Sequence, residues 1–121
     1  MKEAEILDFV RSSIGSVWAL EVLALVRREP KRAWRLDELV RELRSSPTAI
    51  EGASQLLASA GLLARIDDHA CRYEPANPEL DHIGELVQKI YAAKPATVIG
   101  AIFESPDDKL RAFAAAFRFK K

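Results

Sequence analysis

The sequence has little cysteine and no surplus of charge of either sign. Its single cysteine, Cys71, cannot form an internal disulfide, so we expect a protein of the reducing cytoplasm. Eighteen basic and eighteen acidic residues give a formal net charge of zero. Nucleic-acid-binding proteins usually carry a basic surplus that neutralises phosphates. The charge balance therefore makes any DNA binding depend on the charge of one particular face.

Long hydrophobic runs are also missing. The longest apolar stretch runs from Val17 to Val26, is interrupted by Glu21, and at ten residues is too short to span a bilayer. The N-terminal stretch from Met1 to Val10 is acidic and amphipathic, without the apolar core of a signal peptide. The sequence therefore predicts no membrane partner.

The residue patterns of catalytic and cofactor sites are not found either. There is no glycine-rich phosphate loop, and neither His69 nor His82 has a nucleophile at motif spacing. His69 and Cys71, beside Asp67 and Asp68 and with His82 further on, offer metal-ligating atoms. However, Asp and His are common in turns without a metal. We therefore predict no enzyme activity, no metal site and no cofactor.

What the sequence does contain is a series of amphipathic helices with a short hairpin among them. The length of 121 residues fits one domain. Apolar spacing and capping residues predict helices at 2–12, 17–28, 37–43, 47–60 and 78–93, then at 96–103 and around a last stripe of Leu110, Phe113, Ala114 and Phe117. Short β-compatible segments at 34–36, 62–66 and 70–74 predict an edge strand and a hairpin. The predicted fold class is mainly α with a small β-hairpin, built from a core at 17–75, an N-terminal helix at 1–13 and C-terminal helices at 77–121.

The stretch from Trp34 to Pro75 resembles a winged helix-turn-helix domain. The resemblance is carried by Leu39, Val40 and Leu43, the turn Ser45-Ser46-Pro47-Thr48, Ile50, Leu57, and Ala60-Gly61-Leu62-Leu63. The order of helix, short strand, helix, tight turn, helix and hairpin is similar to that of bacterial MarR-type and ArsR-type regulators. In those proteins Leu-x-x-Ala-Gly-Leu, here Leu57 to Leu62, marks the end of the recognition helix and the start of the wing.

The resemblance implies a transcriptional regulator that binds double-stranded DNA. The recognition helix would be 47–60 and the wing 62–74. Polar side chains of the recognition helix and its cap would contact bases or phosphates, namely Ser46, Thr48, Ser54 and Gln55. Arginines would hold the DNA backbone, namely Arg44, Arg65 and Arg72.

The charges of the same stretch favour a different reading. Residues 35–74 contain five arginines and seven carboxylates, a net charge of −2, and no Lys or Arg lies between Ser45 and Ala64. The wing tip carries Asp67 and Asp68, which would pair with the wing arginines. The alternative is a winged helix that binds a protein partner and no DNA. The basic cluster between Arg27 and Arg35 is likewise either a phosphate-binding patch or a solvated helix end.

Apolar stripes in the C-terminal helices predict a homodimer or partner interface. Helices that flank a winged-helix core commonly build such an interface, and the C-terminal part of the chain is rich in phenylalanine. The predicted interface residues are Ile83, Val87, Ile90, Tyr91, Phe113 and Phe117. The alternative is that these stripes belong to the core of a single chain.

Overall fold

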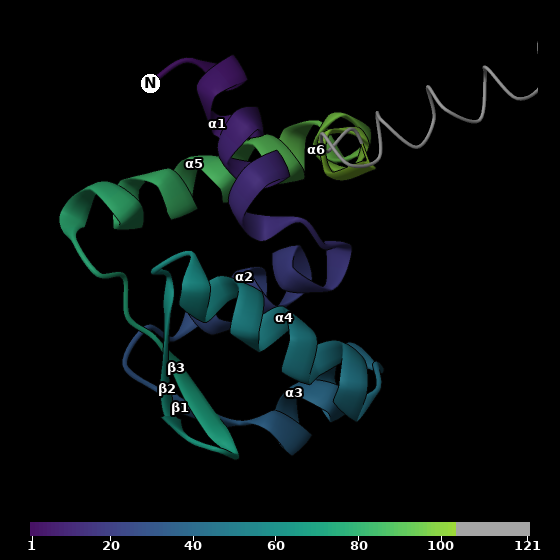
Figure 1. Cartoon of the computed structure of the whole chain (residues 1–121), viewed down its shortest axis with the longest axis vertical. Helices are drawn as coiled ribbons and strands as arrows, with labels where there is room; N and C mark the ends of the chain where they lie inside the picture. Colours follow the sequence, from purple (N-terminus) through teal and green to yellow (C-terminus); the bar gives the residue numbers. More distant parts are fainter. Residues whose placement is uncertain (104–121) are drawn as a thin grey trace, which may run out of the picture.

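The computed structural model describes residues 1–103, which form two layers (Figure 1). One layer contains α2 (Val17–Arg28), α3 (Leu36–Leu43), α4 (Pro47–Ser59) and a small sheet. The other contains α1 (Glu3–Phe9), the π-helical turn η1 (Val10–Ile14), α5 (Pro78–Ala93) and α6 (Pro95–Phe103). The predicted fold class is confirmed. The predicted last helix, with Phe113 and Phe117, lies outside the described residues.

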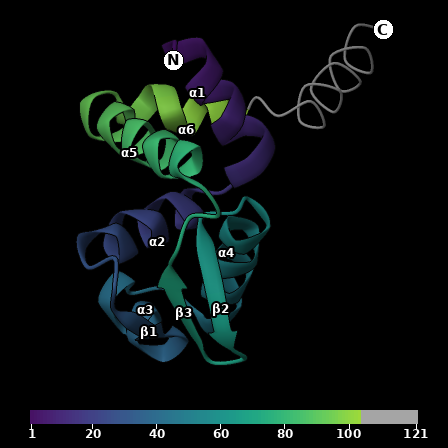
Figure 2. The ribbon, with the colours of Figure 1, turned by 90° about the vertical axis from the view of Figure 1, so that its left-hand side faces the viewer.

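The sheet consists of three short antiparallel strands in the order β1-β3-β2, with β1 (Ala33–Arg35), β2 (Leu63–Asp67) and β3 (Ala70–Tyr73). Trp34 lies opposite Cys71, and Leu63 lies opposite Tyr73. Both the hairpin and the edge strand are therefore confirmed. The order of elements from α2 to β3 is the predicted one, and Figure 2 shows the sheet beside α3 and α4.

Local side-chain chemistry fixes the ends of α3 and α4. Ser46 is the predicted N-cap of α4, since its Oγ accepts a hydrogen bond from the amide of Ala49 at 3.1 Å, and Pro47 follows as the first helical residue. Gly61 follows α4 with φ of +81°, in the left-handed region that glycine adopts without strain. Arg44 at the end of α3 is also left-handed, with φ of +53°, and this residue turns the chain sharply into α4.

The core lies on both sides of α2. Leu20, Leu23 and Val26 of α2 are fully buried with Leu39, Ile50 and Leu57 of α3 and α4. The second layer packs on the same cluster through Val10, Ile14, Val87 and Val98. Two phenol groups tie α5 to the first layer: Tyr91 donates to Glu21 at 2.7 Å, and Tyr73 donates to Asp81 at 2.6 Å. The two layers therefore share one hydrophobic core.

The fold corrects part of the predicted interface. Ile83 is 8% exposed and Val87 is fully buried, and Ile90 and Tyr91 pack against the same cluster. Ile83 and Val87 belong to the core of their own chain because α5 packs against α1 and α2, whereas Ile90 and Tyr91 are only partly buried and their place in an interface stays a prediction. The N-terminal helix is also shorter than predicted: its regular part ends at Phe9, and η1 leads to Gly15, where φ is +61°.

Within residues 1–103 no single helix is long and apolar enough to cross a bilayer. Only when Glu3–Ile14 and Val17–Arg28 are taken together do they have the length and composition of a membrane span, and this pair is bent by 105°.

Candidate functional site

Of the DNA contacts predicted on α4 and its cap, one is buried and the others are exposed. Ser54 was predicted as a contact, and this prediction is wrong because its side chain is fully buried. It lies on the same helix face as Ile50, Ala53 and Leu57, which form the inner stripe of α4. Its Oγ has no hydrogen-bond partner in the described part of the chain. Ser54 is therefore a core residue.

The other predicted contacts of α4 lie at the surface. Ser46, Thr48 and Gln55 are exposed. Ser46 uses its hydroxyl oxygen as the helix cap, and Gln55 donates its amide to Glu51 Oε1 at 3.1 Å. Of these three predicted contacts, Thr48 is free to bind a ligand, and Gln55 can still form further hydrogen bonds through its amide group.

Both wing arginines are bound to groups of their own chain. Arg65 donates to Glu51 Oε1 and to the carbonyl oxygen of Asp68, each at 3.1 Å. Arg72 donates to Glu74 Oε1 at 3.0 Å. The hydrogen bond from Arg65 lowers the pKa of Glu51 below its ordinary value, with a smaller contribution from Gln55. A phosphate would therefore have to displace a carboxylate from each wing arginine.

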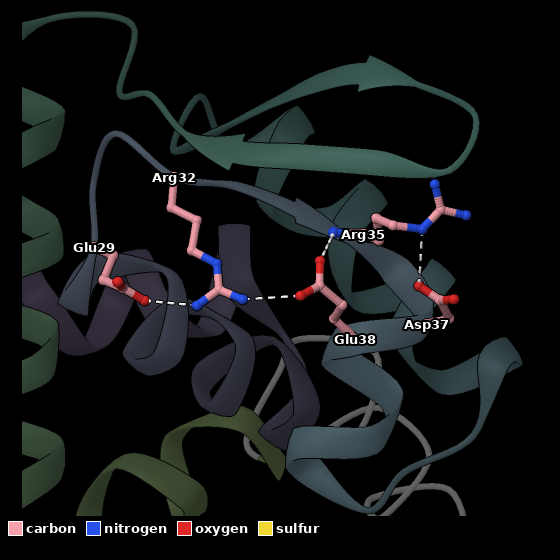
Figure 3. Close-up of polar contacts among 5 residues, drawn as sticks. All are labelled: Glu29, Arg32, Arg35, Asp37 and Glu38. Atoms are coloured by element: carbon pink, nitrogen blue, oxygen red, sulfur yellow. Dashed lines mark hydrogen bonds and ion pairs between the residues drawn. The ribbon is translucent and has the colours of Figure 1, made fainter.

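Two residues of the predicted basic patch, Arg32 and Arg35, are paired with carboxylates (Figure 3). Arg32 donates to Glu29 and Glu38, each at 2.8 Å, and its guanidinium lies 3.6 Å from the ring centroid of Trp34. The amide of Arg35 donates to Glu38 at 2.9 Å, while its side chain pairs with Asp37 at 3.3 Å. The backbone bond from Arg35, followed by the bond from Arg32, lowers the pKa of Glu38. This cluster links α2, β1 and α3 and has carboxylates of its own.

Arg44 is the exception among the predicted phosphate contacts. It is exposed at the turn between α3 and α4 and forms no ion pair within residues 1–103. The neighbouring groove, of about 450 Å³, lies between α3, the start of α4 and the wing tip. Its lining has an apolar floor and more acidic than basic groups, namely Leu36, Asp37, Val40, Arg41, Pro47, Glu51, Asp68 and His69. This wing-side groove is therefore acidic on balance.

A second groove runs along the other side of α4. It has a volume of about 490 Å³ and adjoins a smaller hollow of about 230 Å³ between η1 and the end of α4. The described residues that line the two are all uncharged: Ser12, Ser13, Ser16, Trp18, Thr48, Ala49, Gly52, Ala53, Gln55, Leu56, Ser59 and Ala60. Together they are called the charge-free groove.

Two large apolar side chains are exposed in the charge-free groove. Trp18 is 37% exposed and Leu56 is 39% exposed. Gly52 lines the same groove, and a Cβ added there would meet nothing within 4 Å. Neither Trp18 nor Leu56 was predicted as a surface residue, because α2 is apolar on nearly all sides and Leu56 adjoins the buried Leu57. Trp18 becomes visible as a surface residue only once the bend before α2 is known.

No protein-family model matches the chain, and no curated protein or solved structure matches it. Among the described residues, no group of three His, Cys, Asp or Glu side chains is placed to hold a metal ion. Cys71 is fully buried, and burial raises the pKa of its thiol to about 11. The described surface offers two grooves, an acidic one on the wing side of α4 and the charge-free groove on the other side.

Proposed function

We propose that this chain is a winged-helix protein-interaction module, which binds an apolar segment of a partner in the charge-free groove. One observation carries the proposal. Charged residues make up 30% of the sequence, yet none of the described residues that line this groove is charged. The centres of protein interfaces are depleted of charge and enriched in aromatic side chains. Trp18 and Leu56 supply the apolar centre, and hydroxyl groups surround it.

Physical considerations favour a protein over a nucleic acid as the partner. Full burial of a leucine side chain is worth about 1.5–3 kcal/mol, so covering the exposed part of Leu56 contributes a fraction of that. Tryptophan is the residue type most often found at binding hot spots. A DNA backbone, in contrast, needs cations, and both Arg65 and Arg72 are engaged with carboxylates. We place the module in the cytoplasm, where the thiol of Cys71 stays reduced.

A DNA-binding transcriptional regulator is the second candidate. It is favoured by the order of elements from α2 to β3, by the exposure of Thr48 and Gln55, and by Arg44, which is free of ion pairs in the described structure. In this candidate α4 enters the major groove of double-stranded DNA as part of a homodimer. The dimer would use the C-terminal residues Phe113 and Phe117.

A retardation assay separates the two candidates. We expect no shift of random duplex DNA at about 50 mM salt and micromolar protein, because both wing arginines are engaged with carboxylates and, of the predicted phosphate contacts in the described structure, only Arg44 is without an ion pair. A shift that weakens steeply with added salt, and that Arg65→Ala together with Arg72→Ala diminishes, would instead establish the regulator.

The positive test uses a photo-cross-linking amino acid at Gly52, in the floor of the charge-free groove. The protein that it captures in cells is then purified and its affinity for the unmodified chain is measured by calorimetry. We expect Leu56→Asp to abolish that binding, while Glu42→Lys, on the exposed side of α3, leaves it unchanged. Equal affinity of the Leu56→Asp variant would overturn the docking function.

A further inference from the structure

The charge-free groove is lined in part by η1, against which the last described helix packs. Its smaller part is formed by Ser12 and Ser13 of η1 with Ser59 and Ala60 of α4. The helix α6 packs against η1, and η1 packs against α4. In Figure 1, α6 lies in the upper layer and α4 in the lower one. The last described helix and the smaller part of the groove therefore share η1 as a neighbour.

The residues after Phe103 include an amphipathic segment, which is the kind of segment that an apolar groove binds. Residues 109–121 read KLRAFAAAFRFKK and contain five cations and no carboxylate. Leu110, Phe113 and Phe117 recur at helical spacing, with alanines between them. The stripe is apolar and the basic residues lie beside it or after it. Such a segment can cover an uncharged groove while its cations stay in water.

We propose that residues 109–121 of the same chain occupy the charge-free groove, with the stripe of Leu110, Phe113 and Phe117 covering Trp18 and Leu56. The inference rests on the proposed function, because it names the class of segment that the groove binds. The linker 104–108 has five residues and spans at most about 18 Å. The small residues Ala49, Gly52 and Ala53 leave room on the floor for phenylalanine rings.

The inference also specifies an external partner. A partner that uses this groove must present an amphipathic segment with aromatic residues at helical spacing, and it must displace residues 109–121. The chain then has a built-in competitor, whose local concentration is high because it is tethered. The partner binds more weakly to the whole chain than to a chain whose own segment cannot dock.

Tryptophan fluorescence tests the occupancy in the full chain. The chain has two tryptophans, of which Trp34 is 4% exposed, so that quenching by acrylamide reports on Trp18. We expect Phe113→Asp with Phe117→Asp to shift the emission to longer wavelength and to raise the quenching constant. Phe119→Asp makes the same chemical change off the stripe and is the matched control. Equal quenching of all three proteins would overturn the inference.

Disulfide trapping tests which chain supplies the segment. Gly52→Cys with Ala114→Cys places one thiol on the groove floor and one beside the stripe, and the native Cys71 is fully buried. We expect rapid oxidation to a cross-linked monomer. Glu42→Cys with Ala114→Cys is the control, because Glu42 is exposed on α3 away from the groove. A cross-linked dimer would assign the groove to a second copy, and a rate equal to the control would leave the groove unoccupied. Either result overturns the inference.

The two proposals fail in different ways. If no cross-link forms but the external partner still requires Leu56, only the intramolecular occupant is rejected. If the monomeric cross-link forms but Leu56→Asp leaves the external partner bound, the groove belongs to the chain's own segment and the docking function is rejected.

Discussion

The two sides of α4 differ in how their polar groups are used. On the wing side, Glu51 is bound by Arg65 and Gln55, and Arg72 is bound by Glu74. On the other side, Gly52 and Leu56 lie in a groove without charged lining among the described residues. The side next to the wing is polar but internally satisfied, whereas the groove side is apolar and is not covered by any of residues 1–103.

This difference shows why a net charge of zero says little about binding. The equal numbers of acidic and basic residues are not spread evenly, since many of them pair with each other around β1, α3 and the wing. Exposed pairs of this kind contribute little to stability. Cations in such pairs are less available to bind phosphate. The uncharged groove therefore has more apolar surface that a partner could bury.

The largest effect is expected where α4 meets the core. Leu57→Ala should lower the free energy of unfolding by about 2–5 kcal/mol, because it leaves a cavity beside a fully buried side chain. Leu56→Ala, one residue earlier and 39% exposed, should change stability much less. Urea unfolding of both variants measures the difference. No loss at all for Leu56→Ala would mean that nothing covers Leu56 in solution, and would contradict the proposed occupant of the groove.

Substitutions of the two wing arginines should lower stability less than Leu57→Ala does, and by different amounts. Arg65→Ala removes bonds to both α4 and the wing turn from a side chain that is 22% exposed, so its melting temperature should fall. Arg72→Ala removes one bond between two side chains that are 40% and 58% exposed, and its melting temperature should stay near that of the parent. If both variants melt alike, the bridge from the wing to α4 does not stabilise the fold.

The same bridge predicts a small dependence of stability on pH. Because Arg65 and then Gln55 lower the pKa of Glu51, the folded state favours the charged carboxylate. This contribution is complete above the ordinary pKa of 4.5 and is lost as the pH falls through the lower folded value. We expect Glu51→Gln to flatten the stability profile in this acid range, measured by urea unfolding at successive pH values. A profile parallel to that of the parent would contradict the bridge.

The sequence predicted the elements better than it predicted the site. Ser46, Pro47 and Gly61 are local signals, and each stands at the helix end that it predicted. The groove depends on Trp18 and Leu56, which are far apart in the chain and look like core residues. The chain bends by 105° between the first two helical segments, and Trp18 lies at the surface directly after this bend.

The smallest effect is expected at Ser54, which the resemblance and the helical spacing place on opposite sides of α4. The family resemblance placed Ser54 on the ligand-binding side of α4, whereas the spacing of Ile50, Ala53 and Leu57 places position 54 on the inner side. The structure agrees with the spacing, and the buried hydroxyl has no partner among the described residues. Ser54→Ala removes an unpaired polar group without leaving a large cavity, so stability should stay the same or rise slightly. Partner binding should also be unchanged. A clear loss of stability would mean that the hydroxyl is satisfied in solution, and a loss of binding with unchanged stability would return Ser54 to the surface of α4.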